Sequence, residues 1–163
     1  MSANGHPDPS RALLRHTIAT LSYRAGKAVR NAPDHFSDFR AAPDTRSAGE
    51  ILAHMCDLFD WALALAEGEE RWRNVPPQAW SVDCDRFFSA LTKFDGYLAG
   101  DASLGRPAEQ LFQGPIADAL THTGQLTLMR RLSSSPIRAE NYAKADIVAG
   151  RVGANQTAPR LEF

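Results

Sequence analysis

The chain has few cysteines and no strong excess of charge of either sign. Of its 163 residues only Cys56 and Cys84 are cysteines, and neither lies in a Cys-x-x-Cys motif. A disulfide framework is therefore not expected, and a reduced, cytoplasmic protein is the prediction. The formal net charge of −1 gives no reason to expect nucleic acid or an anionic membrane as a partner.

Long hydrophobic runs are missing as well. No stretch approaches the roughly 18 uninterrupted apolar residues of a transmembrane helix. Residues 1–9 are polar and lack the apolar centre of a secretion signal. The alternation of apolar and polar residues that is typical of strands is almost absent, so a β-sheet fold is not expected.

Four helical patterns account for most of the chain. Apolar residues recur at three- and four-residue steps over about 10–30, 47–67, 81–99 and 115–132. These patterns predict an all-α protein, a four-helix bundle. We expect a single domain over residues 1–163, with a helical core at about 10–132 and an irregular tail at 133–163 that contains a short helix at 139–147.

Local signals predict where the helices begin and end. Ser47 and Glu50 fit a capping box at the start of the second helix. Ser81 is expected to be the N-cap of the third helix, and Pro115 the first residue of the fourth. Gly68 is expected to stop the second helix.

Three residues have the chemistry and spacing of metal ligands. Asp118 and His122 are four residues apart on the fourth predicted helix, which places them on one face, about 40° apart around its axis. His54 lies in the apolar stripe of the second helix. Two imidazoles and a carboxylate suit Zn²⁺, Ni²⁺, Fe²⁺ or Mn²⁺. The alternatives are a core histidine at His54 and, at Asp118, an acid favoured by the helix dipole.

Several neighbouring residues remain open to more than one interpretation. Asp57, one turn from His54, is a candidate general base, but it can equally support a ligand ring or face solvent. Gly124 inside a helix indicates the close approach of another helix or a ligand, or plain packing. Arg130 and Arg131 either reach an anionic substrate or stabilise a helix C-terminus.

The segments EILAHMCDL at 50–58 and DALTHTGQL at 118–126 together resemble the DinB/YfiT-like superfamily of metalloenzymes. The resemblance covers roughly residues 10–132 and extends, as in a subset of relatives, to 135–137 and 140–142. It implies an up-down-down-up four-helix bundle whose metal is held by one histidine of the second helix and an H-x-x-x-H pair of the fourth. His54 and His122 match two of these ligands, and Asp118 stands where the family usually has the other histidine.

The resemblance also implies a function. It predicts a metal-dependent enzyme acting on a small molecule, either an S-transferase that uses a low-molecular-weight thiol or a hydrolase, and it favours a homodimer. A carboxylate at Asp118 makes the site harder and more anionic, or marks a lost metal. The alternative is therefore a non-catalytic bundle for binding or dimerisation with a vestigial metal site. We expect Asn141 or Tyr142 to lie over the bundle end as a lid.

Overall fold

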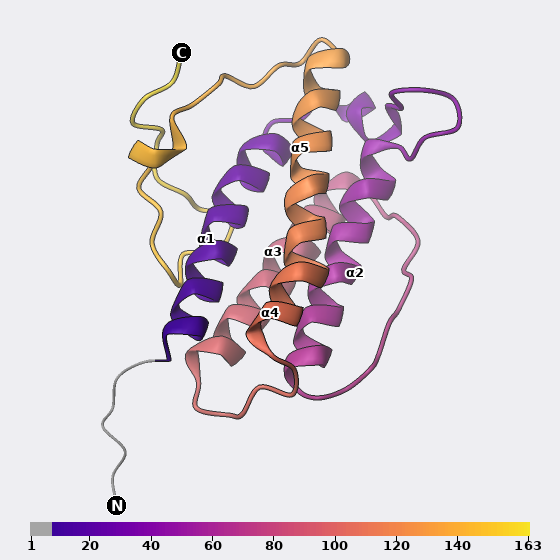
Figure 1. The fold of residues 1–163 in the computed structure, drawn as a ribbon. Coiled ribbons are helices and arrows are strands. Elements are labelled where there is room, and N and C mark those ends of the chain that lie inside the picture. The colour runs from indigo at the N-terminus through magenta and orange to yellow at the C-terminus, as the bar shows by residue number, and fades with distance from the viewer. Residues whose placement is uncertain (1–7) are drawn as a thin grey trace, which may run out of the picture.

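Residues 8–163 are described by a computed structural model, in which four long helices form a bundle (Figure 1). The long helices are α1 (Pro9–Val29), α2 (Ala48–Ala66), α3 (Trp80–Ala99) and α5 (Ala117–Leu132). The shorter elements are η1 (Asp34–Asp38), α4 (Ala108–Leu111), η2 (Phe112–Ile116) and η3 (Tyr142–Lys144). The predicted all-α helical bundle is confirmed, since the described residues contain isolated bridges but no strand.

Residues 1–7 lie outside the described part of the chain, so the structure does not test the prediction that this segment is no secretion signal. Within residues 8–163, no helix combines the length and the apolar character needed to cross a bilayer.

The helices run in two directions. The guanidinium of Arg11, near the start of α1, donates to the carbonyl of Leu98 at the end of α3, and the indole of Trp80, at the start of α3, donates to the carbonyl of Val29. α1 and α3 are therefore antiparallel neighbours. α5 runs in the same direction as α1, and α2 in the same direction as α3 (Figure 1). Since α1 packs against α3 and α5, α2 lies across the bundle from it.

Apolar faces of all four helices meet in one core. Phe59 of α2 packs against Phe87 and Phe94 of α3, with ring centroids 6.0 and 6.2 Å apart. Each such ring contributes about 1.5–3 kcal/mol when it is buried. The other large side chains with no more than 2% exposure are Ile18, Leu21, Phe36, Leu52, Met55, Leu91, Leu98, Leu111 and Ile116.

The capping box of α2 is confirmed. The amide of Glu50 donates to the Ser47 hydroxyl at 3.2 Å, and the amide of Ser47 donates to the Glu50 carboxylate at 2.6 Å. Gly68 follows the end of α2 with a φ of +87°, a conformation that favours glycine. Gly105 packs directly on it, so that a Cβ at Gly105 would overlap the Gly68 backbone.

Two predicted helix starts are wrong. α3 begins at Trp80 rather than after an N-cap at Ser81. The bond from Trp80 to α1 and a bond from the Gln78 amide to Asp83 at 2.8 Å fix this start by contacts that no capping pattern contains. Pro115 is not the first residue of the last helix, because it lies inside the π-helical η2, which joins α4 to α5. A wider π turn accommodates the proline, which lacks an N–H.

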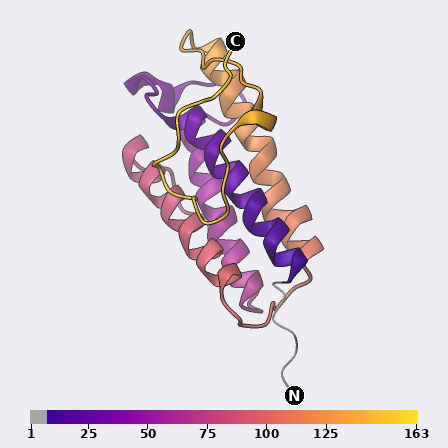
Figure 2. The same cartoon turned by 90° about the vertical axis from the view of Figure 1, so that its left-hand side faces the viewer.

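The tail after α5 crosses the outer side of α1 (Figure 2). The Tyr23 hydroxyl donates to Glu140 at 2.6 Å, and the Lys27 ammonium binds Glu140 at 2.9 Å and Glu162 at 2.6 Å. The Glu140 side chain is completely buried by these contacts. Residues 133–163 are therefore fixed by this buried charge cluster and also by Val152, which is buried in the hydrophobic core.

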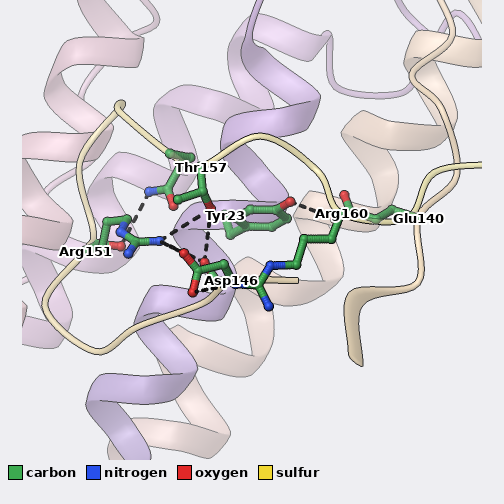
Figure 3. A network of polar contacts seen from close by, with 7 residues as sticks. Tyr23, Glu140, Asp146, Arg151, Thr157 and Arg160 are labelled. Atoms are coloured by element: carbon green, nitrogen blue, oxygen red, sulfur yellow. Dashed lines mark hydrogen bonds and ion pairs between the residues drawn. The ribbon is translucent and has the colours of Figure 1, made fainter. Parts of the chain in front are cut away.

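The predicted tail helix at 139–147 is wrong, since only η3 is helical there. The polar groups of this segment bond to the rest of the tail instead (Figure 3). Arg151 donates to the Asp146 carboxylate at 3.1 Å, and Thr157 donates to the Asp146 carbonyl at 3.2 Å. Arg160 lies 3.6 Å from the same carboxylate, so Asp146 is bound to residues that follow it in the tail.

Candidate metal site

The antiparallel crossing of α2 and α5 brings the three predicted ligands together. His54 Nε2 lies 3.3 Å from Asp118 Oδ2, and His122 Nε2 lies 3.4 Å from Asp118 Oδ1. One ligand atom from each residue lies within 4.8 Å of the other two. The two imidazoles are perpendicular, with ring centroids 5.0 Å apart, so both present a nitrogen to the same carboxylate.

The site is closed on the side of the histidines and open on the side of the carboxylate. The side chains of His54 and His122 are 17% and 11% exposed, whereas that of Asp118 is 45% exposed. Position 54 lies at the edge of the apolar face of α2, next to the buried Ala53 and Met55. A ligand would therefore approach from the solvent side of Asp118.

Gln125 orients the ring of His122 from one turn further along α5. Its side-chain oxygen lies 2.7 Å from His122 Nδ1. An amide oxygen only accepts, so Nδ1 carries the hydrogen and Nε2 directs a lone pair toward Asp118. Since Nε2 then carries no hydrogen, it cannot donate a hydrogen bond to Asp118 Oδ1, which lies 3.4 Å away. A metal cation between the two atoms would bind the lone pair of each.

The donor set and spacing fit a divalent transition metal. Ligand atoms about 2.1 Å from a tetrahedral metal lie about 3.4 Å from one another. Each imidazole nitrogen lies at about this spacing from one oxygen of Asp118: His54 Nε2 is 3.3 Å from Oδ2 and His122 Nε2 is 3.4 Å from Oδ1. Three protein ligands leave at least one coordination position open, and the mixed nitrogen and oxygen set suits Zn²⁺, Ni²⁺, Fe²⁺ or Mn²⁺.

Burial lowers the pKa of His54 below its ordinary value. The hydrogen bond with Asp118 opposes this shift, while the nearby Arg46 and His122 add to it. His54 is therefore neutral at pH 7, which is the form of imidazole that binds metals.

An aromatic wall formed by the loop at 67–79 flanks His54. The Trp72 ring lies 5.7 Å from the His54 ring and 5.7 Å from the Trp61 ring of α2. The Val75 amide of the same loop donates to Asp57 at 3.1 Å, which holds the loop against the helix. Nothing in the sequence pattern distinguished Trp72, because loop residues have no periodicity.

Two cavities adjoin the cluster, and Arg46 lines both. One, of about 450 Å³, is lined by Ala41, Thr45, Arg46, Ile51, His122, Gln125, Leu128 and Met129. The other, of about 250 Å³, is lined by Arg46, Glu50, Ala53, His54, Asp57, Asn74, Val75, Pro76 and Pro77. Within residues 8–163 the guanidinium of Arg46 makes neither a hydrogen bond nor an ion pair, so its charge is available to a ligand. Sequence reasoning did not identify this residue.

Asp57 has a different role from each one predicted. It is 2% exposed, and its carboxylate lies 2.5 Å from Arg86 of α3. Arg86 also binds Asp60 at 2.8 Å, and these hydrogen bonds raise the pKa of Arg86 despite its burial. Asp57 thus neither faces solvent nor supports the His54 ring, and its ion pair makes it unsuitable as a general base.

The structure decides between the alternatives for two further residues of α5. Arg130 is 5% exposed and donates to the carbonyls of Ala28 and Arg30 at 2.8 and 3.0 Å, so it stabilises a helix C-terminus, that of α1 rather than that of its own helix. No other helix approaches Gly124, because a Cβ there would meet no atom within 4 Å.

The expected lid is wrong as well. The Tyr142 ring lies edge-on to Tyr23, 6.2 Å away, and the Arg24 guanidinium lies 4.3 Å from its centre. Both partners belong to α1, whereas the candidate ligands lie between α2 and α5. Asn141 accepts from the Ala143 amide at 3.1 Å and so caps η3.

Both cysteines are free, as predicted. Cys56 is buried and donates to the Asp83 carbonyl at 3.3 Å. Burial raises the pKa of the Cys84 thiol to about 12. Neither thiol is therefore a nucleophile at neutral pH.

Comparisons of the chain with models of protein families, with curated proteins and with solved structures found no match. Its activity therefore has to be inferred from the residues of the site and from the cavities beside them.

Proposed function

We propose that the chain is a metal-dependent enzyme of DinB/YfiT-like type, in which His54, Asp118 and His122 hold a divalent transition metal. The proposal is carried by one observation: ligand atoms from two helices lie within 4.8 Å of one another on a side open to solvent. Three protein ligands with open positions are typical of catalytic metals. Such a metal supplies a lowered pKa for a bound water or thiol, or polarises a carbonyl. The helix directions in Figure 1 are those that the resemblance implies, which supports the proposal.

The cavities support a small-molecule substrate with an apolar body and an anionic group. A volume of about 450 Å³ is in the range of small-molecule sites. Ile51, Leu128 and Met129 provide apolar surface that excludes water, and Arg46 provides the charge for a carboxylate or similar group.

The proton chemistry favours thiol-dependent S-transfer over hydrolysis. The two carboxylates that line the cavities are both in ion pairs, Glu50 with Arg40 at 2.8 Å and Asp57 with Arg86. Amide hydrolysis needs a group that protonates the leaving amine. A thiol ionises near neutral pH when a cation lies beside it, without a separate general base. We therefore place a low-molecular-weight thiol first and a hydrolase second.

A non-catalytic bundle with a vestigial site is the second candidate. At 3.3 Å the Nε2–H of His54 can also donate to Asp118, which would hold the carboxylate without a metal. The homodimer implied by the family resemblance is compatible with either candidate, and sedimentation of the purified protein tests it.

Metal content separates the two candidates. The protein is purified without a histidine tag, and its bound metals are measured by mass spectrometry beside the variants Asp118→Ala and His122→Ala. We expect one equivalent of metal, which both variants lose. His16→Ala is the matched control, because His16 is an exposed helical histidine outside the site and should leave the metal in place.

Two outcomes would contradict the proposal at different levels. A protein that binds no metal, and whose melting temperature does not change with Zn²⁺, Ni²⁺ or Mn²⁺, would be the vestigial bundle. A Co²⁺-loaded protein whose absorption spectrum does not respond to any low-molecular-weight thiol would exclude the S-transferase and leave the hydrolase.

A further inference from the structure

A separate cavity lies on the other side of α5, between α5, α1 and the tail. Its volume is about 390 Å³, and three arginines from three different elements line it. Arg24 comes from α1, Arg131 from α5 and Arg138 from the tail. Position 124 at its floor lies about 200° around the helix from His122, so this cavity faces away from the candidate metal site.

The positive charge of this cavity is not neutralised by its own acidic residue. Among the described residues that line it, Glu140 is the one carboxylate. That carboxylate is completely buried and is occupied by the Tyr23 hydroxyl and the Lys27 ammonium, as the contact with Tyr23 in Figure 3 shows. Glu140 therefore does not neutralise the three guanidinium groups, and their positive charge is available to a ligand in the cavity.

The arginines are exposed and weakly engaged. The guanidinium carbon of Arg24 lies 4.3 Å from the centre of the Tyr142 ring, a cation–π contact that occupies none of its N–H groups with an acceptor oxygen. Arg138 lies 3.8 Å from Glu162, which already binds Lys27 at 2.6 Å. Arg131 has no hydrogen bond or ion pair from its side chain in residues 8–163.

Gly124 leaves the floor of the cavity open. Glycine inside a helix costs about 1 kcal/mol relative to alanine. No packing accounts for this cost here, because a Cβ at Gly124 would meet nothing within 4 Å. The missing side chain instead leaves this part of the cavity wall open to a ligand.

We propose that this cavity is a second binding site, for a small anion carrying two or more negative charges on phosphate or carboxylate groups. Guanidinium groups bind both kinds of oxygen in pairs, and arginines from separate elements can contact several oxygens at once. A volume of about 390 Å³ accommodates a phosphorylated or polycarboxylate small molecule. The site is independent of the metal, since none of the three candidate ligands lines it.

Pyrophosphate and citrate, titrated into the full-length protein at constant ionic strength, test the proposal. The Asp118→Ala variant serves as background, so that chelation of a metal at the other site cannot contribute to the heat of binding. We expect at least one anion to bind with a Kd of about 1 mM or tighter and to shift the Gly124 amide resonance. Arg131→Gln should weaken binding about fivefold or more. Gly124→Leu should abolish it without lowering the melting temperature.

Arg73→Gln is the matched control, because Arg73 is exposed, lies in the loop at 67–79, and lines neither this cavity nor those beside the metal site. Stronger binding of pyrophosphate would assign a phosphate ligand, and stronger binding of citrate a polycarboxylate. The proposal is overturned if neither anion binds, or if Arg73→Gln weakens binding as much as Arg131→Gln.

Discussion

Gln125 fixes the imidazole of His122 through a contact of 2.7 Å between its side-chain oxygen and Nδ1. The two residues are one helical turn apart, so the orienting group and the candidate ligand belong to the same rigid element. The other nitrogen of the ring is thereby aimed at Asp118.

Removal of this orienting contact should weaken metal binding without abolishing it. We expect Gln125→Ala to lower the affinity for Zn²⁺ about tenfold, because partners of this kind typically contribute 10- to 100-fold to metal affinity. Competition with a chromophoric chelator measures the change. Gln110→Ala is the control, since Gln110 is exposed on α4 and bonds to neither histidine. Equal affinities for wild type and Gln125→Ala would mean that the contact does not support a metal ligand.

Trp72 should report metal binding through its fluorescence. Its ring lies 5.7 Å from that of His54, close enough for Co²⁺ or Ni²⁺ at the site to quench its emission. We expect Trp72→Phe to remove most of the metal-dependent quenching. Trp80→Phe should retain it, because Trp80 packs against Phe36, with ring centroids 5.3 Å apart, at the start of α3. Because Trp61 lies 5.7 Å from Trp72, quenching that survives in the double variant Trp61→Phe/Trp72→Phe would place the metal elsewhere.

The ion pair between Arg86 and Asp57 should be a major source of stability. Asp57 is buried, so Arg86→Ala leaves its carboxylate without a cation, which typically costs about 3 kcal/mol. Unfolding in urea measures the loss. Arg106→Ala provides the comparison, because its partner Glu70 is 79% exposed and such surface pairs contribute less than about 1 kcal/mol. If both variants lost a similar free energy of unfolding, the buried pair of Arg86 and Asp57 would stabilise the fold no more than a surface pair does.

Alkaline pH should release the tail from α1. Burial, then the bond with Glu140, raises the pKa of Tyr23 above 10.0. Bonds with Glu162 and Glu140 raise the pKa of Lys27 above 10.5, although burial opposes this shift. Because both pKa values are higher in the folded state, the stability they contribute is complete below pH 10 and is lost as the pH rises through the folded-state values.

Phenolate absorbance at alkaline pH measures this transition. Glu140→Gln should bring the titration of Tyr23 closer to its ordinary pKa, and Tyr23→Phe identifies which part of the signal belongs to this residue. Limited proteolysis of residues 133–163 should accelerate over the same pH range. A Tyr23 titration that is unchanged in Glu140→Gln would contradict a role for Glu140 in holding the tail.

Features set by neighbours in the sequence were predicted well. The capping box of Ser47 and Glu50 has both partners within one turn, and the apolar periodicity of each helix lies within that helix. The predicted helical bundle follows from such local patterns. The spacing of Asp118 and His122 is also local, and it placed both on one face of α5.

Features set by distant residues could not be predicted in the same way. Asp57 is buried against Arg86 and the loop at 67–79, which no pattern around Asp57 indicates. The start of α3 depends on a bond from Trp80 to α1, and the form of the tail depends on Glu140 meeting Lys27, 113 residues earlier. Only the family resemblance predicted that His54 would lie next to Asp118.

The placement of α1 has a consequence for how the chain folds. Its polar contacts with the rest of the bundle join residues far apart in sequence: Arg15 to Asp95, 80 residues away, Arg130 to Ala28, 102 residues away, and Tyr23 to Glu140, 117 residues away. Each requires closure of a long loop before it is formed, which slows folding. We therefore expect the parallel pair of α2 and α3, joined by the loop at 67–79, to form before α1 docks on α3 and α5.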